Sequence, residues 1–211
     1  MFVLVILPFL RPKLGRWGST DEELVRELPG DDLIKEIDGS YNHAITIDVA
    51  PADVWPWIVQ LGQNKGGFYS YELLENITSC KIRNADAIVP EFQDTKVGDK
   101  VMMHPKAAPY IVVAIDPVRS FIIRLRINLE NNETVDPAEP LPPKYQDGTW
   151  LFHLEETAEG KTRLVTRSRN IWSNSKMNTF FYGLFGIISV AMDRKLLKGI
   201  KKRAEKAAGA S

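Results

Sequence analysis

Aromatic side chains gather in one short part of this sequence, where Trp55, Trp57, Phe68, Tyr69 and Tyr71 follow closely on one another. Large aromatic side chains line cavities for apolar molecules, and a buried phenol needs a hydrogen-bond partner that such a molecule can supply. The same residue types fill ordinary cores, which is the commoner role of any one of them. As a group they predict an aromatic-lined cavity for a lipid, a sterol-like molecule or a polycyclic molecule.

Catalysis in such a cavity would need polar groups within hydrogen-bond reach of the reacting atoms. The candidates are Tyr69, Tyr71 and His104, the last because it stands at the end of an expected strand. For His104 a surface or structural role is the alternative. The acidic residues of segment 86–99 would suit a division of acid and base roles, although an ordinary turn explains the Val-Gly-Asp within it.

No motif indicates a metal, phosphate or nucleic-acid site. The three histidines are isolated, and the single cysteine, Cys80, excludes an intramolecular disulfide and a zinc-thiolate cluster. The stretch NKGGFYS lacks the Gly-Lys-Ser/Thr ending of a phosphate loop. Lys plus Arg and Asp plus Glu both number 27, so no positive field exists to hold nucleic acid. We expect no metal, no cofactor and no nucleic-acid partner.

The elements that position these residues begin with a strand and two short helices. Residues 43–48 alternate between apolar and polar, which is typical of a half-buried strand. Pro51 suits the first turn of a helix, and Gly62 suits its end. Residues 68–77 follow a glycine pair and predict a second short helix.

Five further segments are rich in Val, Ile, Phe and Thr and predict strands. They are residues 99–104, 110–116, 120–127, 148–156 and 161–170. Residues 128–147 hold four prolines and no periodicity, so we expect a lid or an irregular excursion there. A long helix is expected from Ser173 or Ser175 to about residue 206.

Alternation within these strands predicts an antiparallel sheet with one buried face and one wet face. Phe121 and Ile123 fall on the buried side of one strand, and Trp150 and Phe152 on that of another. On the wet side we expect His153 and five arginines, namely Arg124, Arg126, Arg163, Arg167 and Arg169.

The two ends of the chain differ from its middle. An apolar run opens the sequence, and it is shorter than the about 20 residues that span a bilayer. It fits a truncated membrane segment, a monotopic anchor helped by the bases of 11–16, or an arm packed on the domain. Residues 19–38 are acidic, with Thr20 and Glu23 at capping-box spacing, and residues 193–206 are basic. These charge blocks could face each other, meet water, or, for the basic block, touch anionic lipid.

Several stretches of the sequence are similar to one known superfamily. They cover nearly the whole chain after residue 15 and include APADVWPWIVQLGQNKGGFYSYELLEN (50–76), NADAIVPEFQDTKVGD (84–99), TWLFHLE (149–155) and MDRKLLKGIKKRAE (192–205). On these stretches the chain resembles the helix-grip superfamily of START lipid-transfer domains, the birch pollen allergen and polyketide cyclase/dehydrase-like proteins (SRPBCC). The resemblance implies an α+β fold: a curved antiparallel sheet around a long C-terminal helix, with two short helices after the first strand. It implies a pocket between sheet and helix, and no catalytic residue is assigned from it.

The length of 211 residues fits one domain with extra segments at its ends. We expect an apolar and basic N-terminal arm or truncated membrane segment at 1–18, an acidic helix and linker at 19–40, and a helix-grip domain at 41–207. The chain is expected to be cytoplasmic, at most peripheral to a membrane.

The main hypothesis is a carrier or sensor for a hydrophobic small molecule. The expected ligand contacts are Trp57, Phe68, Tyr69, Tyr71, Phe121, Ile123, Trp150, Phe152, Phe181 and Phe185. Membrane contact is expected through residues 1–16 and 193–206. The alternatives are a metal-free cyclase- or dehydratase-like enzyme using the same cavity, and an interaction module that binds protein or lipid through the apolar C-terminal helix.

Overall fold

A computed structural model describes residues 15–72, 76, 81–173 and 176–209, without the side chains of residues 176–188. In chain order its elements are α2 (Asp21–Val25), the 3-10 helix η1 (Asp31–Leu33), β1 (Gly39–Ile47), α3 (Pro51–Val59), the 3-10 helix η2 (Pro90–Phe92), β2 (Lys100–Val101), β3 (Tyr110–Asp116), β4 (Ser120–Asn128), β5 (Glu133–Thr134), β6 (Tyr145–Glu156), β7 (Thr162–Trp172) and α5 (Lys176–Ala208).

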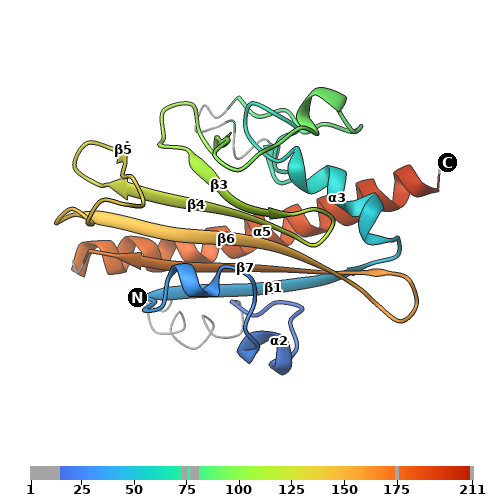
Figure 1. Cartoon of the computed structure of the whole chain (residues 1–211), viewed down its shortest axis with the longest axis horizontal. Helices are drawn as coiled ribbons and strands as arrows, with labels where there is room; N and C mark the ends of the chain where they lie inside the picture. The colour runs from blue at the N-terminus through green and yellow to red at the C-terminus, as the bar shows by residue number, and fades with distance from the viewer. Residues whose placement is uncertain (1–14, 73–75, 77–80, 174–175, 210–211) are drawn as a thin grey trace, which may run out of the picture.

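The strands form one seven-stranded antiparallel sheet in the order β1-β7-β6-β4-β3-β2, with β5 paired to β4. The long helix α5 runs along one face of this curved sheet, and α3 lies beside its C-terminal half (Figure 1). The expected α+β helix-grip arrangement is therefore confirmed. It follows from the sequence pattern, because a sheet with one apolar face buries that face against a helix.

The face of the sheet toward α5, called the inner face here, carries alternate residues of each strand. The strand register aligns His43, Thr166, Phe152 and Phe121 in one row across β1, β7, β6 and β4. All four side chains are nearly inaccessible to solvent. The main core therefore lies between the inner face, α3 and the C-terminal half of α5.

The prediction that the second face of the sheet is exposed to water is wrong. The N-terminal segment, which precedes β1, covers this outer face. Leu28 of that segment packs in a second apolar cluster with Ile122, Leu151 and Val165, which point away from α5. An Ile, a Leu and a Val on the outer side of the strands therefore need a cover, and the chain before β1 provides it. His153 points outward as expected but is also largely covered, and it lies 3.1 Å from Glu155.

The outer-face arginines hold this cover in place. Arg163 donates two hydrogen bonds to the Glu23 carboxylate at 2.7 and 2.8 Å, and Glu23 also caps the amide of Thr20. Arg167 is only 5% exposed and pairs with Asp31. Buried arginines need such partners, so Glu23 and Asp31 of the acidic block complement the sheet's arginines, whereas the other six acids of the block are exposed.

The two charge blocks do not face each other among the residues described. The acidic block binds the outer face, whereas α5 lies on the inner side and its basic end finds other partners. Lys201 pairs with Asp48 at 3.2 Å, and Arg203 pairs with Asp86 at 2.8 Å. The basic end of α5 is thus attached to the connection after β1 and to the loop before η2.

Two local expectations are corrected. Residues 68–71 are not helical. The backbone amides of Phe68 and Tyr69 donate hydrogen bonds to the Asn84 side chain, and Tyr69 has a φ of 52°, outside the helical region. Residues 72 and 76 are helical, and most of the remaining predicted second helix lies outside the described residues. The proline-rich excursion is also shorter than expected, because β5 pairs with β4 inside it and β6 starts at Tyr145.

Candidate ligand-binding site

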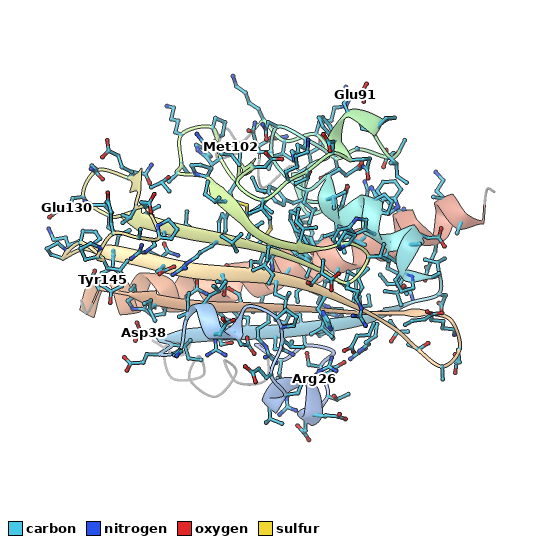
Figure 2. The ribbon with its side chains drawn as sticks, viewed as in Figure 1. Arg26, Asp38, Glu91, Met102, Glu130 and Tyr145 are labelled. Atoms are coloured by element: carbon cyan, nitrogen blue, oxygen red, sulfur yellow. The ribbon has the colours of Figure 1, made fainter. Side chains whose placement is uncertain are left out.

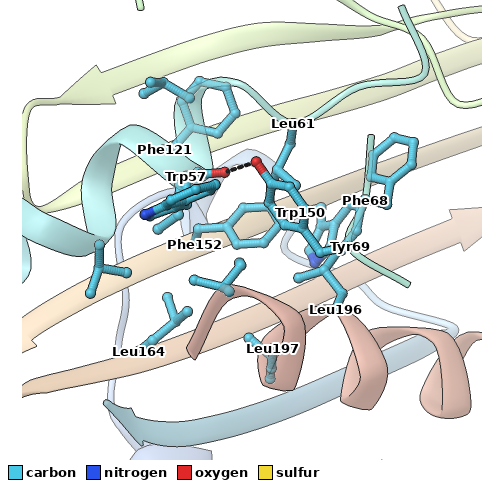
Figure 3. Packing of buried hydrophobic residues seen from close by; sticks show 14 of the residues in the cluster. Trp57, Leu61, Phe68, Tyr69, Phe121, Trp150, Phe152, Leu164, Leu196 and Leu197 are labelled. Carbon is cyan, nitrogen blue, oxygen red and sulfur yellow. Dashed lines mark hydrogen bonds between the residues drawn. The ribbon is translucent and has the colours of Figure 1, made fainter. Parts of the chain in front are cut away.

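Most of the predicted aromatic residues meet between the sheet and the C-terminal half of α5, as Figure 3 shows. The rings of Trp57 and Tyr69 lie edge to face with centroids 5.9 Å apart, and those of Trp150 and Phe152 lie 4.8 Å apart. Phe121 is tilted against Phe152 at 6.5 Å. Most of this set is fully buried. Phe68 and Ile123 belong to the same cluster, and Leu196, Leu197 and Ile200 of α5 pack in it. These aromatic residues therefore fill one end of the interior themselves; we call it the filled end.

Tyr69 has its hydrogen-bond partners within the chain. Its hydroxyl donates to the Trp57 carbonyl at 3.1 Å and accepts from the Gln60 side-chain amide at 2.9 Å. Burial raises the pKa of the phenol well above its usual range, against the opposing effects of Gln60 and of Arg203. The Tyr69 hydroxyl therefore needs no hydrogen-bond partner from a ligand. Its hydrogen bonds link α3 to the 68–71 segment, and we call this link the Tyr69 clamp.

The other candidates for polar contact are placed differently. The Tyr71 side chain is 42% exposed, with the Lys195 ammonium 5.4 Å from its ring centroid, so Tyr69 and Tyr71 point apart. His104 lies in the loop after β2 and accepts the amide of Lys106 at 3.0 Å. The side chains of Phe181 and Phe185 lie outside the described part of α5.

Burial decreases along the inner face beyond the row that contains His43. In the next row Tyr41 and Ser168 are only partly buried, and in the row after it Asn170 and Leu125 are partly buried too. Trp150 is 9% exposed, whereas its neighbour Phe152 is 0% exposed. This second half of the inner face, which we call the open half, is thus less completely packed than the filled end.

The open half has polar and apolar sides. Ser168 and Asn170 of β7 are joined by a 2.8 Å hydrogen bond, whereas Leu125 and Ile127 on β4 present apolar surface. The first half of α5 runs past this part of the sheet (Figure 1), and residues 177–192 contain no charged side chain. Such a surface suits a molecule that is mostly apolar and has few hydrogen-bonding groups.

The outer end of the open half is fastened by backbone and carboxylate contacts. The backbone amide of Trp172 donates a hydrogen bond to the Asp38 carboxylate at 3.0 Å. The backbone amide of Ser173 donates one to the Tyr145 carbonyl at 2.9 Å. Figure 2 shows Asp38 and Tyr145 at the same end of the sheet. The strands that border the open half are therefore held together at this end, which favours a preformed site.

Sequence reasoning missed an ionisable pair in the interior. Nδ1 of His43, a residue that is 1% exposed, lies 3.3 Å from Oδ2 of Asp193 on α5. Burial raises the pKa of Asp193, and His43 opposes that shift. The sequence did contain a signal for a buried acid. Asp193 interrupts an apolar stripe at helical spacing, whose other members are Val190, Leu197 and Ile200.

A separate hollow of about 840 Å³ opens near the end of the outer face, and nothing in the sequence predicted it. It lies between the connection from β1 to α3, the turn from β3 to β4, and the end of β6. Its polar lining includes Arg119, His153 and Glu155. In the described part of the chain, no cluster of three or more His, Cys, Asp or Glu side chains could hold a metal ion.

Comparisons with known proteins give fold-level likeness only. No protein-family model matches the chain, and no curated protein is significantly similar to it. A conserved protein from Geobacillus kaustophilus matches with 11% identity over 80% of this chain and 97% of its own, at a TM-score of 0.45. The Aha1 dimer from Colwellia psychrerythraea matches with 12% identity over 76% and 98%, at a TM-score of 0.36. Ara h 8.0201 matches with 9% identity over 80% and 98%, at a TM-score of 0.36.

Similarities at this level show neither a family nor a ligand for this chain. Within the part of the chain that the structure describes, no helix has the length and hydropathy that crossing a membrane requires.

Proposed function

We propose that this protein binds a hydrophobic small molecule between the open half of the inner face and the first half of α5, as a carrier or a sensor. The observation that carries the proposal is the fall in burial across one row of the sheet, from His43 and Thr166 to Tyr41 and Ser168. A sheet that packs closely on a helix at one end and loosely at the other leaves room for a ligand at the loose end.

The proposed site lies away from most of the aromatic residues that the sequence predicted as ligand contacts. Trp57, Phe121 and Phe152 are at most 1% exposed and pack on one another, so they form the closed end of the cavity. Trp150 lies at the border between the two halves and is the aromatic residue best placed to touch a ligand. The sequence stretches that resemble START and polyketide cyclase/dehydrase-like proteins support the same class of function. We infer membership of that superfamily from them.

Uptake of the neutral apolar dye Nile red tests this site. Ser168→Phe places a ring on the partly buried β7 position of the open half, and dye binding should be lost because the space is filled. Ser40→Phe makes the same change at an exposed position of β1 on the outer face and serves as the matched control. Dye binding that is equal in both folded variants and the unchanged protein would refute a ligand site in the open half.

A second proposal is contact with an anionic membrane surface through the exposed side of α5. The Arg194 guanidinium lies 5.1 Å from the Trp17 ring centroid, and the Lys198 ammonium lies 5.9 Å from it. Lys195 adds a third exposed base beside Tyr71. Clustered bases attract anionic lipid, and amphipathic aromatic side chains favour the interface.

The chain itself supports this location, because Trp17 closely follows the apolar N-terminal run and its carbonyl accepts the amide of Ala44 on the edge strand β1. Flotation with phosphatidylserine-containing vesicles should be reduced in a variant with Arg194, Lys195 and Lys198 changed to Glu. The control changes the exposed Lys100 and Lys106 to Glu, away from α5. Equal recovery of both variants with the vesicles would exclude this surface.

A further inference from the structure

We propose that the His43–Asp193 pair is a polar anchor that binds the hydroxyl group of an otherwise apolar ligand. This inference rests on the proposed ligand site and deepens it, because it names the chemical class: a long-chain or polycyclic alcohol. The geometry that carries it is the contact of the His43 ring with the Asp193 carboxylate at 3.3 Å, on the last fully buried row before the open half.

The pair lies at the boundary between the filled end and the open half. His43 lies on the inner face of β1, and Tyr41, the next inner residue of that strand, is partly buried in the open half. The rings of these two residues are stacked with centroids 6.4 Å apart. The pair therefore lies where the filled end stops, at the inner limit of the space assigned to a ligand.

The two side chains of the pair differ in accessibility. The Asp193 side chain is 17% exposed, whereas that of His43 is 1% exposed. Asp193 is therefore the member of the pair that a small polar group can contact more readily. A carboxylate has two oxygens and about four lone-pair positions, so one contact with His43 leaves capacity for a further donor.

The strand positions around the pair are uncharged. The inner positions of β1, β7, β6 and β4 within the core hold no Lys, Arg, Asp or Glu, and residues 177–192 of α5 have no charge. Arg194 and Lys195, the bases that follow Asp193, are exposed and lie over the rings of Trp17 and Tyr71. Among the inner strand positions of the core, His43 is thus the one basic side chain, and it contacts Asp193.

This environment selects a hydroxyl over a carboxylate. A ligand carboxylate would bring a second negative charge next to the Asp193 carboxylate, and burying an unbalanced charge is costly. An alcohol donates one hydrogen bond to the carboxylate and leaves the charge of the pair unchanged. An ether of the same length can occupy the same apolar space but has no proton to donate.

Displacement of Nile red by dodecan-1-ol, 1-methoxydodecane and dodecanoate tests the anchor. The unchanged protein should bind the alcohol roughly tenfold or more tightly than the ether, the effect of a hydrogen bond to a charged group. Dodecanoate should also bind more weakly than the alcohol. Asp193→Asn should still bind Nile red but should lose most of the preference for the alcohol over the ether and part of the discrimination against dodecanoate.

His43→Gln is the second variant, and it keeps the test valid if Asp193→Asn does not fold. It removes the base beside Asp193 and should increase discrimination against dodecanoate while Nile red still binds. If the unchanged protein does not bind Nile red, the ligand site and the anchor both fail. If it binds the dye but displays equal affinities for alcohol and ether, or if Asp193→Asn keeps the preference, the anchor alone is refuted.

Discussion

Replacing Gly199 by alanine should destabilise the protein, although alanine is the better helix former. Gly199 lies on the buried side of α5 against the backbone of the 68–71 segment. A Cβ atom at this position would lie 2.6 Å from Cβ of Tyr69 and still closer to the Tyr69 carbonyl oxygen. Cβ atoms do not approach other heavy atoms this closely, so either α5 or the segment must move.

The magnitude follows from two opposing effects. Gly to Ala in a helix interior stabilises by about 1 kcal/mol, through the smaller loss of backbone entropy. Overpacking costs typically about 1 to 3 kcal/mol, and here one clashing atom belongs to the backbone and cannot rotate away. The shift would also strain the Tyr69 clamp to Trp57. We expect a net loss of about 1 to 2 kcal/mol in the free energy of unfolding.

Urea denaturation followed by far-ultraviolet circular dichroism measures this loss. The control is Gly209→Ala at the end of α5, where the nearest atom to the new Cβ would be the Glu205 carbonyl oxygen at 3.4 Å. It should change stability by less than about 0.5 kcal/mol. If Gly199→Ala is as stable as the control or more stable, then close packing of α5 on the 68–71 segment does not close the filled end.

Three further changes test the same structure. Leu28→Ala should lower the free energy of unfolding by about 2 to 4 kcal/mol in urea, because Leu28 is 5% exposed beneath the N-terminal cover; a loss below about 0.5 kcal/mol would make that cover dispensable. Tyr69→Phe should cost about 1 to 3 kcal/mol, because the buried Trp57 carbonyl loses its donor; unchanged urea stability would contradict the clamp. Burial alone would raise the pKa of Glu23, but the hydrogen bonds from Arg163 and the Thr20 amide and the charges of Arg163 and Arg26 together lower it. This carboxylate therefore stabilises the fold above the ordinary Glu pKa and loses that effect in acid. Glu23→Gln should therefore be less stable at neutral pH, and the difference should shrink as the pH falls below the ordinary Glu pKa; a difference that is independent of pH would refute this role.

The candidate site was only partly predictable from the sequence. Strand alternation placed Phe121, Ile123, Trp150 and Phe152 on the inner face, because successive side chains of a strand point to opposite sides. The same reasoning cannot say whether such residues contact a ligand or one another. That depends on how far α3 and α5 lie from the sheet, which is set by long-range packing.

Polar residues were the weakest part of the sequence interpretation. Tyr69 satisfies its hydroxyl through Gln60 and a carbonyl of α3, partners that its neighbours in sequence do not reveal. His43 and Asp193 are separated by most of the chain and meet only when α5 crosses β1. A single Asp in an apolar stripe was a visible signal, but its partner could be identified only in three dimensions.

The sequence by itself determined the order of elements, the antiparallel sheet, the long C-terminal helix and the capped acidic helix of Thr20 and Glu23. These features depend on local periodicity, turn residues and caps, which act over a few positions of the chain. Only the tertiary structure decided that the acidic block covers the outer face through Arg163 and Arg167, and that the inner face is filled at one end and looser at the other. The physical reason is that charge pairing and close packing join residues distant in sequence, so their partners are set by the fold as a whole.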